Sequence, residues 1–160
     1  MARSIETDPY HDFRFQLVDP AGGNLDPVAG FTSVSMPNLV VEEAQYREGT
    51  FLWTQKYPGI PSVSDVTMTK GIFRRDSDFF NWVLKVVNGG QEYRTELVLQ
   101  QYHIQDEFGI NGSPSRATRL REVWGKDAKP TNDFEASSSA IAIQSLTVSV
   151  EEFEVEILST

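Results

Sequence analysis

The chain has 160 residues, of which 23 are acidic and 14 basic, so its formal net charge at pH 7 is −9. Since contact with nucleic-acid phosphates needs a basic face, this balance argues against direct nucleic-acid binding and favours a basic protein as partner. The length and the hydrophobic content of 39% predict one globular domain, residues 1–160, and the absence of cysteine excludes disulfides, thiolate metal sites and a cysteine nucleophile.

The N-terminal third of the chain predicts strands. Residues 13–17 alternate apolar and polar side chains, as a half-buried strand does. Residues 19–24 form a dense turn pattern of Asp, Pro, Gly and Asn. Residues 30–36 and 39–46 are expected to be two further strands, which could pair as a hairpin through Met36-Pro37-Asn38.

A long, polar connection with several aromatic residues follows, and we call residues 46–61 the arm. Trp53 lies in it beside Phe51 and Leu52, where a single chain would offer little to bury them. Exposed apolar side chains on a long connection often mark a contact with another chain. The alternative is a loop that folds back onto its own domain.

The period of the pattern changes after the arm. Residues 65–70 alternate, with Val66 and Met68 on one face, and predict a strand. Residues 77–88 predict the only long helix, for which Asp76 or Ser77 would be the N-cap and Gly89 the C′ residue.

The helix is predicted to pack one apolar side on the sheet. Helical spacing groups Phe80, Val83 and Val87 on this face, with Phe79 and Leu84 flanking it. Trp82 is also expected to pack against the sheet, and Trp124 to pack in the same way at a strand end.

The C-terminal half returns to strands. Residues 93–102 and 117–124 are expected to be strands, and residues 104–114 and 126–139 loops. After residue 140 the apolar positions change parity twice, which predicts bulges near Gln144-Ser145 and Glu151-Glu152 in one long, curved strand.

No constellation of catalytic residues is visible. His11 and His103 lack a metal-ligand partner at a useful spacing, and the group Asp8, His11 and Asp12 is better explained as a polar strand entry than as a metal site. Asp106-Glu107 lacks the spacing of a calcium loop. We therefore expect no catalytic, cofactor-binding or metal-binding residue, no cofactor, and a protein that is not an enzyme.

The sequence shows no apolar segment typical of a secretory signal and no run of membrane-spanning length. The expected site of synthesis and assembly is the cytoplasm, without stable membrane anchoring.

Several ordered motifs resemble one known family. Glu43–Gly49 (EAQYREG), Lys56–Ile60 (KYPGI) and Ser64–Gly71 (SDVTMTKG) are similar to the tail-tube proteins of contractile phage tails and of extracellular contractile injection systems. Further similar segments are Asp8–Phe15, Ala29–Ser35, the helix start Asp78–Trp82, and the closing segments Ala140–Val148 and Glu151–Glu154.

The resemblance implies a mainly β (α+β) fold, a tail-tube-like β-barrel or two-sheet sandwich with one flanking helix, related to the type VI secretion tube protein. It also implies six subunits per ring, stacked rings, and an arm that connects neighbouring rings. Tyr46, Arg47 and Glu48 would then set the register between rings, and the buried contacts would come from Phe51, Leu52, Trp53 and Tyr57.

The implied function is that of a structural protomer of a hollow inner tube, which a contracting sheath drives through a target envelope. The implied partners are other copies of the chain, a sheath protein, baseplate or spike and terminator proteins, and cargo or DNA that slides without specific binding along an acidic wall. An alternative within the same machine is a tube-initiating or capping adaptor. A further alternative is a small β-barrel enzyme or ligand-binding protein, which would need a catalytic constellation or a pocket.

Overall fold

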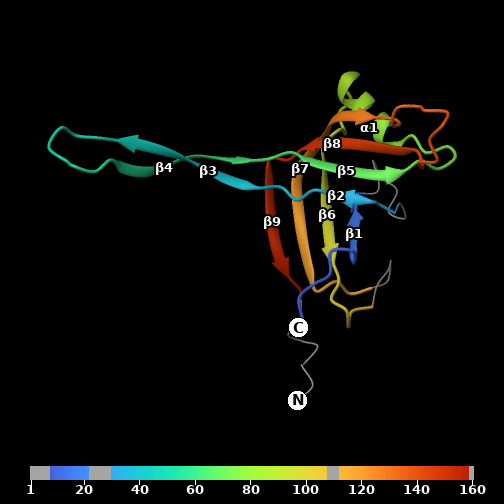
Figure 1. The fold of residues 1–160 in the computed structure, drawn as a ribbon, viewed down its shortest axis with the longest axis horizontal. Coiled ribbons are helices and arrows are strands. Elements are labelled where there is room, and N and C mark those ends of the chain that lie inside the picture. Colours follow the sequence, from blue (N-terminus) through green and yellow to red (C-terminus); the bar gives the residue numbers. More distant parts are fainter. Residues whose placement is uncertain (1–7, 22–29, 108–111, 159–160) are drawn as a thin grey trace, which may run out of the picture.

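The structure is a computed structural model, and it describes residues 8–21, 30–107 and 112–158. These residues form mostly strands, with one α-helix among them (Figure 1). The elements are β1 (Phe15–Val18), β2 (Ser33–Val34), β3 (Leu39–Tyr46), β4 (Gln55–Val63), β5 (Val66–Gly71), α1 (Asp78–Val87), β6 (Thr95–Gln101), β7 (Arg116–Lys129), β8 (Ile143–Ser149) and β9 (Glu152–Ile157).

The long strand β7 joins two layers of antiparallel strands. The first layer contains β1, β6, the N-terminal half of β7 and β9, in that order. The second layer contains the C-terminal half of β7, then β8, β5 and β2. Figure 1 shows the strands of the first layer running across those of the second. The remaining pair, β3 and β4, projects from the body as a separate hairpin.

Two irregularities allow β7 to belong to both layers. Opposite β6 the register shifts near Glu122, which has a left-handed backbone with φ of 52°. Opposite β8 the register shifts again at Lys126, between Gly125 and Asp127. An extra residue in one strand bends that strand and increases its twist, so these two shifts turn β7 from one layer into the other.

The core lies between the two layers. β5 and β8 alternate strictly, and the residues Val66, Met68, Leu146 and Val148 are fully buried. This confirms the predicted strand at residues 65–70 and its buried face. The first layer and the segment after β8 complete the core with Leu17, Leu97, Leu99, Leu120, Val123 and Val150.

α1 confirms the predicted helix but not its predicted buried face. Phe79 and Trp82 are each 1% exposed, whereas Phe80 is 47% and Val87 73% exposed. The prediction was wrong because the apolar residues form one wide face, opposite Asp78, Asn81 and Lys85, and the periodicity does not show which part of that face is buried. As expected, Trp82 packs against the sheet, and its indole N–H donates to the carbonyl of Tyr93 at 2.7 Å.

The ends of α1 follow the predicted pattern in part. Ser77 is the N-cap residue but makes no side-chain capping bond, and the backbone N–H of Asp78 reaches Asp76 Oδ1 at 3.4 Å instead. At the other end, Gly89 has φ of +68°. That left-handed conformation ends helices and favours glycine, so the predicted C′ residue is confirmed.

A buried ion pair connects α1 to the second layer. Lys70 on β5 is 1% exposed, and its ammonium lies 2.9 Å from the carboxylate of Asp76. The side-chain amide of Gln144 donates to the same carboxylate at 2.9 Å. The Lys70 ammonium also lies 4.6 Å above the ring of Phe79. A buried charge is tolerated only when it is paired in this way, so the cluster determines where the helix begins.

Three predictions about the strands were wrong. The strands at 30–36 and 39–46 do not pair with each other: β2 pairs with β5, and β3 pairs with β4. Residues 126–129, predicted as loop, continue β7. The register of β8 on β5 is continuous through Gln144 and Ser145, so no bulge lies there. The expected irregularity near Glu151 is a break between β8 and β9.

The fold class is as predicted, with the two-sheet alternative correct and the closed barrel not. Within the described ranges, β1 and β2 are the two ends of the hydrogen-bonded strand order and do not pair with each other. The predicted turn at 19–24 and the predicted loop at 104–114 lie partly outside the described residues.

Candidate functional site: the arm and the open sheet edges

The arm is a two-stranded hairpin and not an irregular connection. Residues 46–61 fall within β3, the turn and β4, and the hairpin begins earlier than predicted, at Leu39, so we extend the arm to the whole hairpin, residues 39–63. It extends far from the rest of the molecule (Figure 1). A two-stranded hairpin without a further layer is marginally stable in water, so this element needs a partner to cover it.

The arm exposes many large apolar side chains. At its end, Leu52 is 89% and Trp53 82% exposed. The other members of this set, all more than half exposed, are Leu39, Val40, Val41, Tyr46, Phe51, Tyr57 and Ile60. An apolar surface of this extent on one element is typical of a contact with another chain.

A bulge shapes the middle of the arm. β4 advances from Pro58 to Pro61 while β3 advances only from Glu43 to Val41, so β4 carries one extra residue. A Cβ atom on Gly59 would lie 2.9 Å from the carbonyl oxygen of the opposite residue, Glu42, so only glycine fits here. The two prolines lack N–H donors, which hinders pairing of β4 with an additional strand.

Polar contacts order the outer half of the arm. Tyr46 donates its hydroxyl to Glu48 at 3.2 Å, and Tyr57 donates to Gln55 at 2.6 Å. Lys56 lies 3.5 Å from Glu43, both partly exposed. Arg47 is exposed and has no ion pair or hydrogen bond with the described part of the chain. All seven residues predicted for subunit contacts therefore lie at or near the outer end of one element.

The first layer has two open edges. β1 pairs only with β6, and β9 only with β7, so in the described ranges the outer backbone groups of both strands lack a strand partner. Unpaired edges of this kind can accept a strand from another chain. The four strands alternate in direction, so β9 of one copy and β1 of the next would be antiparallel.

The face of the first layer that points away from the core is strongly charged. Arg119 donates to Glu156 at 2.8 Å and to Glu96 at 3.0 Å. The bonds to Glu156 and then Glu96 raise the pKa of Arg119 above its ordinary value. Arg121 donates to Glu154 at 3.0 Å. With Glu152, which lies 3.9 Å from Arg121, these residues contribute four carboxylates and two guanidinium groups to this face.

The two histidines lie just outside the first layer, His11 before the start of β1 and His103 after the end of β6. His11 stacks on Phe13 at 5.2 Å, and His103 meets the edge of Tyr10 at 5.4 Å. The backbone N–H of His103 donates to the carboxylate of Asp106 at 2.6 Å. Both histidines thus make local structural contacts.

The described residues contain no group of three or more His, Asp or Glu side chains arranged to hold a metal ion. Within the same residues, no helix is long and apolar enough to cross a membrane.

The sequence reasoning missed the open edges and the strand character of β4. The alternation in 152–157 predicted a strand there, but no sequence pattern tells an edge strand from a central one. The sequence did not predict strand β4, because Pro58, Gly59 and Pro61 are typical turn residues. An alternation of exposed aromatic and polar residues on both sides of them was the available indication.

A family model matches most of the chain, and several solved structures share its fold. A family model described as T4-like virus tail tube protein gp19 matches residues 11–154. No curated protein matches the chain. A cryo-EM structure of the anti-feeding prophage cap, described as the tube-terminating cap, is 20% identical with a TM-score of 0.77, covering 98% of this chain and 95% of the other.

Two further solved structures share the fold. A chain in the extended sheath–tube complex of PVC, an extracellular contractile injection system, is 19% identical with a TM-score of 0.76 and covers 96% and 95% of the two chains. A type six secretion system protein is 13% identical with a TM-score of 0.52 and covers 91% of this chain and 83% of the other.

Proposed function

The chain belongs to the T4-like virus tail tube protein family, and from this premise we propose that it is a structural protomer of the hollow inner tube of a contractile tail or injection system. Copies form hexameric rings, the rings stack, and the channel conducts cargo or DNA without binding it specifically. The protein has no catalytic role. The tube assembles in the cytoplasm and contacts a sheath, a baseplate or spike, and a terminator.

The arm carries this proposal. The hairpin exposes Leu52 and Trp53 almost fully, so these side chains do not stabilise the single chain by burial. Burying one such side chain contributes roughly 1.5–3 kcal/mol, and a stacked ring offers a surface on which several are buried at once. In this proposal Phe51, Leu52, Trp53 and Tyr57 supply the buried contacts between rings, and Tyr46, Arg47 and Glu48 supply polar contacts that set the register.

The open edges support ring formation within one layer of the tube. Pairing β9 of one copy with β1 of the next continues the first layer from subunit to subunit. Such a contact uses two different surfaces, and it closes into a ring when the rotation per subunit allows it. Closure removes the exposed edges, which would otherwise favour aggregation.

The charged face of the first layer then becomes the wall of the channel. It presents Glu96, Glu152, Glu154 and Glu156 against Arg119 and Arg121. A net acidic wall repels DNA and acidic cargo, so that they slide without adhering. Unchanged loading and release of cargo after replacement of these glutamates by lysine would argue against this role.

The test compares an aromatic pair in the arm with one aromatic residue outside it, in assembly and in folding. Phe51→Ala combined with Trp53→Ala should reduce stacking measured by sedimentation velocity, while the urea unfolding midpoint of the unassembled chain changes little. Tyr93→Ala, which alters a half-buried aromatic residue outside the arm, is the control. Equal losses of stacking and of folding stability in the arm variant would contradict the proposal.

The second candidate is a tube-terminating or tube-initiating adaptor. The similarity to the anti-feeding prophage cap supports an adaptor as much as the similarity to a chain of the sheath–tube complex supports a tube protomer. An adaptor ends or begins a tube and does not propagate. Single rings that never stack, at any protein concentration, would identify the adaptor.

A further inference from the structure

We infer that the tip of the arm, residues 47–54, inserts into a groove of a second copy that lies between β2 and the edge formed by β1 and β6. The inference rests on the proposed function and deepens it, because it names the surface that receives the arm. It is carried by the groove, by the chemistry of the tip and by the length of the arm.

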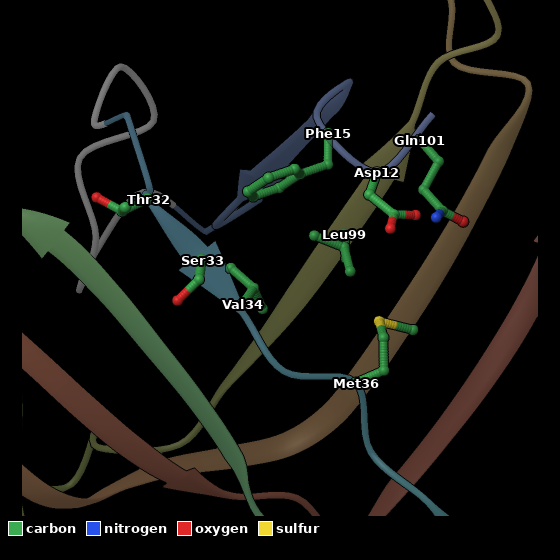
Figure 2. A pocket seen from close by; sticks show the side chains of 8 residues that line it. All are labelled: Asp12, Phe15, Thr32, Ser33, Val34, Met36, Leu99 and Gln101. Carbon is green, nitrogen blue, oxygen red and sulfur yellow. The ribbon is translucent and has the colours of Figure 1, made fainter. Parts of the chain in front are cut away.

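The groove lies where the two layers fail to close. β1 and β2 are the two ends of the hydrogen-bonded strand order, and the space between them has a volume of about 390 Å³. Figure 2 shows apolar side chains on both of its walls. They are Phe15 from β1, Leu99 from β6, Val34 from β2 and Met36 from the segment after β2.

The rim of the groove is polar and carries one charge. Thr32, Ser33 and Gln101 contribute hydroxyl and amide groups, and Asp12 contributes a carboxylate (Figure 2). Asp12 is exposed and makes no ion pair with the residues that the structure describes. The groove therefore suits a group that is apolar at its end and positively charged at its side.

The arm tip has this combination. Phe51, Leu52 and Trp53 form its apolar end, and Arg47 at its beginning is an exposed cation without an ion pair in the described part of the chain. Pockets of a few hundred cubic ångströms bury organic groups of the size of one or two such side chains. Arg47 would then face Asp12 across the rim, and complementary charges of this kind fix register and orientation.

The arm cannot reach the groove of its own chain. A strand of eight residues at about 3.3 Å per residue places the tip roughly 25 Å from the start of β3 at Leu39. Met36 in the groove precedes Leu39 by only three positions, and Figure 1 shows the arm pointing away from β1 and β2. The occupant is therefore a second copy. Repeated contacts between two different surfaces extend without limit, as a stack of rings requires.

Crosslinking tests this contact cleanly because the natural chain has no cysteine. One variant carries Thr50→Cys in the tip and Thr32→Cys in the groove, both conservative in size. A short bis-maleimide is added to assembled protein, since a disulfide would demand stricter geometry. Each copy then offers one thiol to each neighbour, so denaturing gels should show a ladder of dimers, trimers and longer species, and mass spectrometry should find the 50-to-32 link.

Control variants test whether crosslinks arise from random collisions between copies. Either single-cysteine variant can yield at most dimers. Thr50→Cys combined with Gln91→Cys, an exposed position after α1, should not extend beyond dimers. In parallel, Arg47→Asp and Asp12→Arg should each raise the concentration for half-maximal assembly about tenfold, and the double reversal should return it to within about threefold of the natural protein.

The outcomes separate the two proposals. Stacked rings in electron micrographs without the 50-to-32 ladder, or with an equal ladder from the Gln91 control, would overturn the groove contact and leave the tube function standing. Failure of the double charge reversal to restore assembly would also overturn the contact. Absence of both stacks and ladder would contradict the tube function together with the contact.

Discussion

Neighbouring phenylalanines at the start of α1 allow a sharp test of how the helix packs. Phe79 is 1% exposed, its ring centroid lies 6.1 Å from that of Phe31, and the Lys70 ammonium lies above its ring. Truncation of a buried phenylalanine to alanine removes its transfer free energy and leaves a cavity, which together cost about 3–5 kcal/mol. Loss of the cation–π contact acts in the same direction.

Phe80 is the matched control, since it has the same chemistry, lies in the same turn and is 47% exposed. Half of the transfer free energy of a phenylalanine is about 1 kcal/mol, and the better helix propensity of alanine offsets part of it. We therefore expect Phe79→Ala to lower the free energy of unfolding at least threefold more than Phe80→Ala.

The assay is urea unfolding of the unassembled chain, followed by circular dichroism, with thermal unfolding as a second measurement. For a chain of this size, 3–5 kcal/mol corresponds to a decrease in Tm of roughly 6–20 °C for Phe79→Ala. Equal losses in the two variants, or a larger loss for Phe80→Ala, would refute the assignment of the buried face.

Three further predictions concern the ion pair of Lys70 and Asp76, the carboxylate of Asp106, and Gly59 in the arm. Lys70→Met should lower the free energy of unfolding in urea by about 3–5 kcal/mol, because it leaves the Asp76 carboxylate without its cation, and adding Asp76→Leu should recover part of this loss. Burial opposes ionisation of Asp106, but hydrogen bonds from Ser115 and His103 outweigh burial and lower its pKa. A carboxyl group with a lowered pKa stabilises the fold above its ordinary pKa near 4, and this stabilisation is lost as pH falls through the lowered value. Asp106→Asn should therefore be less stable than the natural protein at pH 7 and equally stable once the pH is below the lowered pKa. Gly59→Val should displace β4 from Glu42 and reduce stacking in sedimentation velocity, while the unfolding midpoint of the unassembled chain changes little, because the arm is outside the core.

Local sequence patterns predicted an element well where one of its faces is buried and the other is exposed to solvent. The alternation in β5 identified Val66 and Met68 as core residues because a half-buried strand has a strict period of two. The same reasoning failed for α1, whose apolar face is too wide for the periodicity to locate its buried part. The packing partner, and not the periodicity, decides that Phe79 is buried and Phe80 is not.

Strand pairing was the part of the fold that the sequence could not supply. Val34 on β2 pairs with Met68 on β5, which lies far along the chain. The strand that follows β2 in sequence, β3, pairs instead with β4 in the projecting hairpin. Such choices depend on contacts distant in sequence. Exposure of Trp53 could be predicted because its surroundings offered nothing to cover it, and the structure agrees. The groove that we assign as its receptor arises from two unpaired edges and has no local sequence pattern.

The most direct test of the tube function is negative-stain electron microscopy of the purified protein over a range of protein and salt concentrations. The proposal predicts rings with a central hole that stack into hollow tubes as protein concentration rises. A monodisperse monomer at every concentration and salt condition would contradict it.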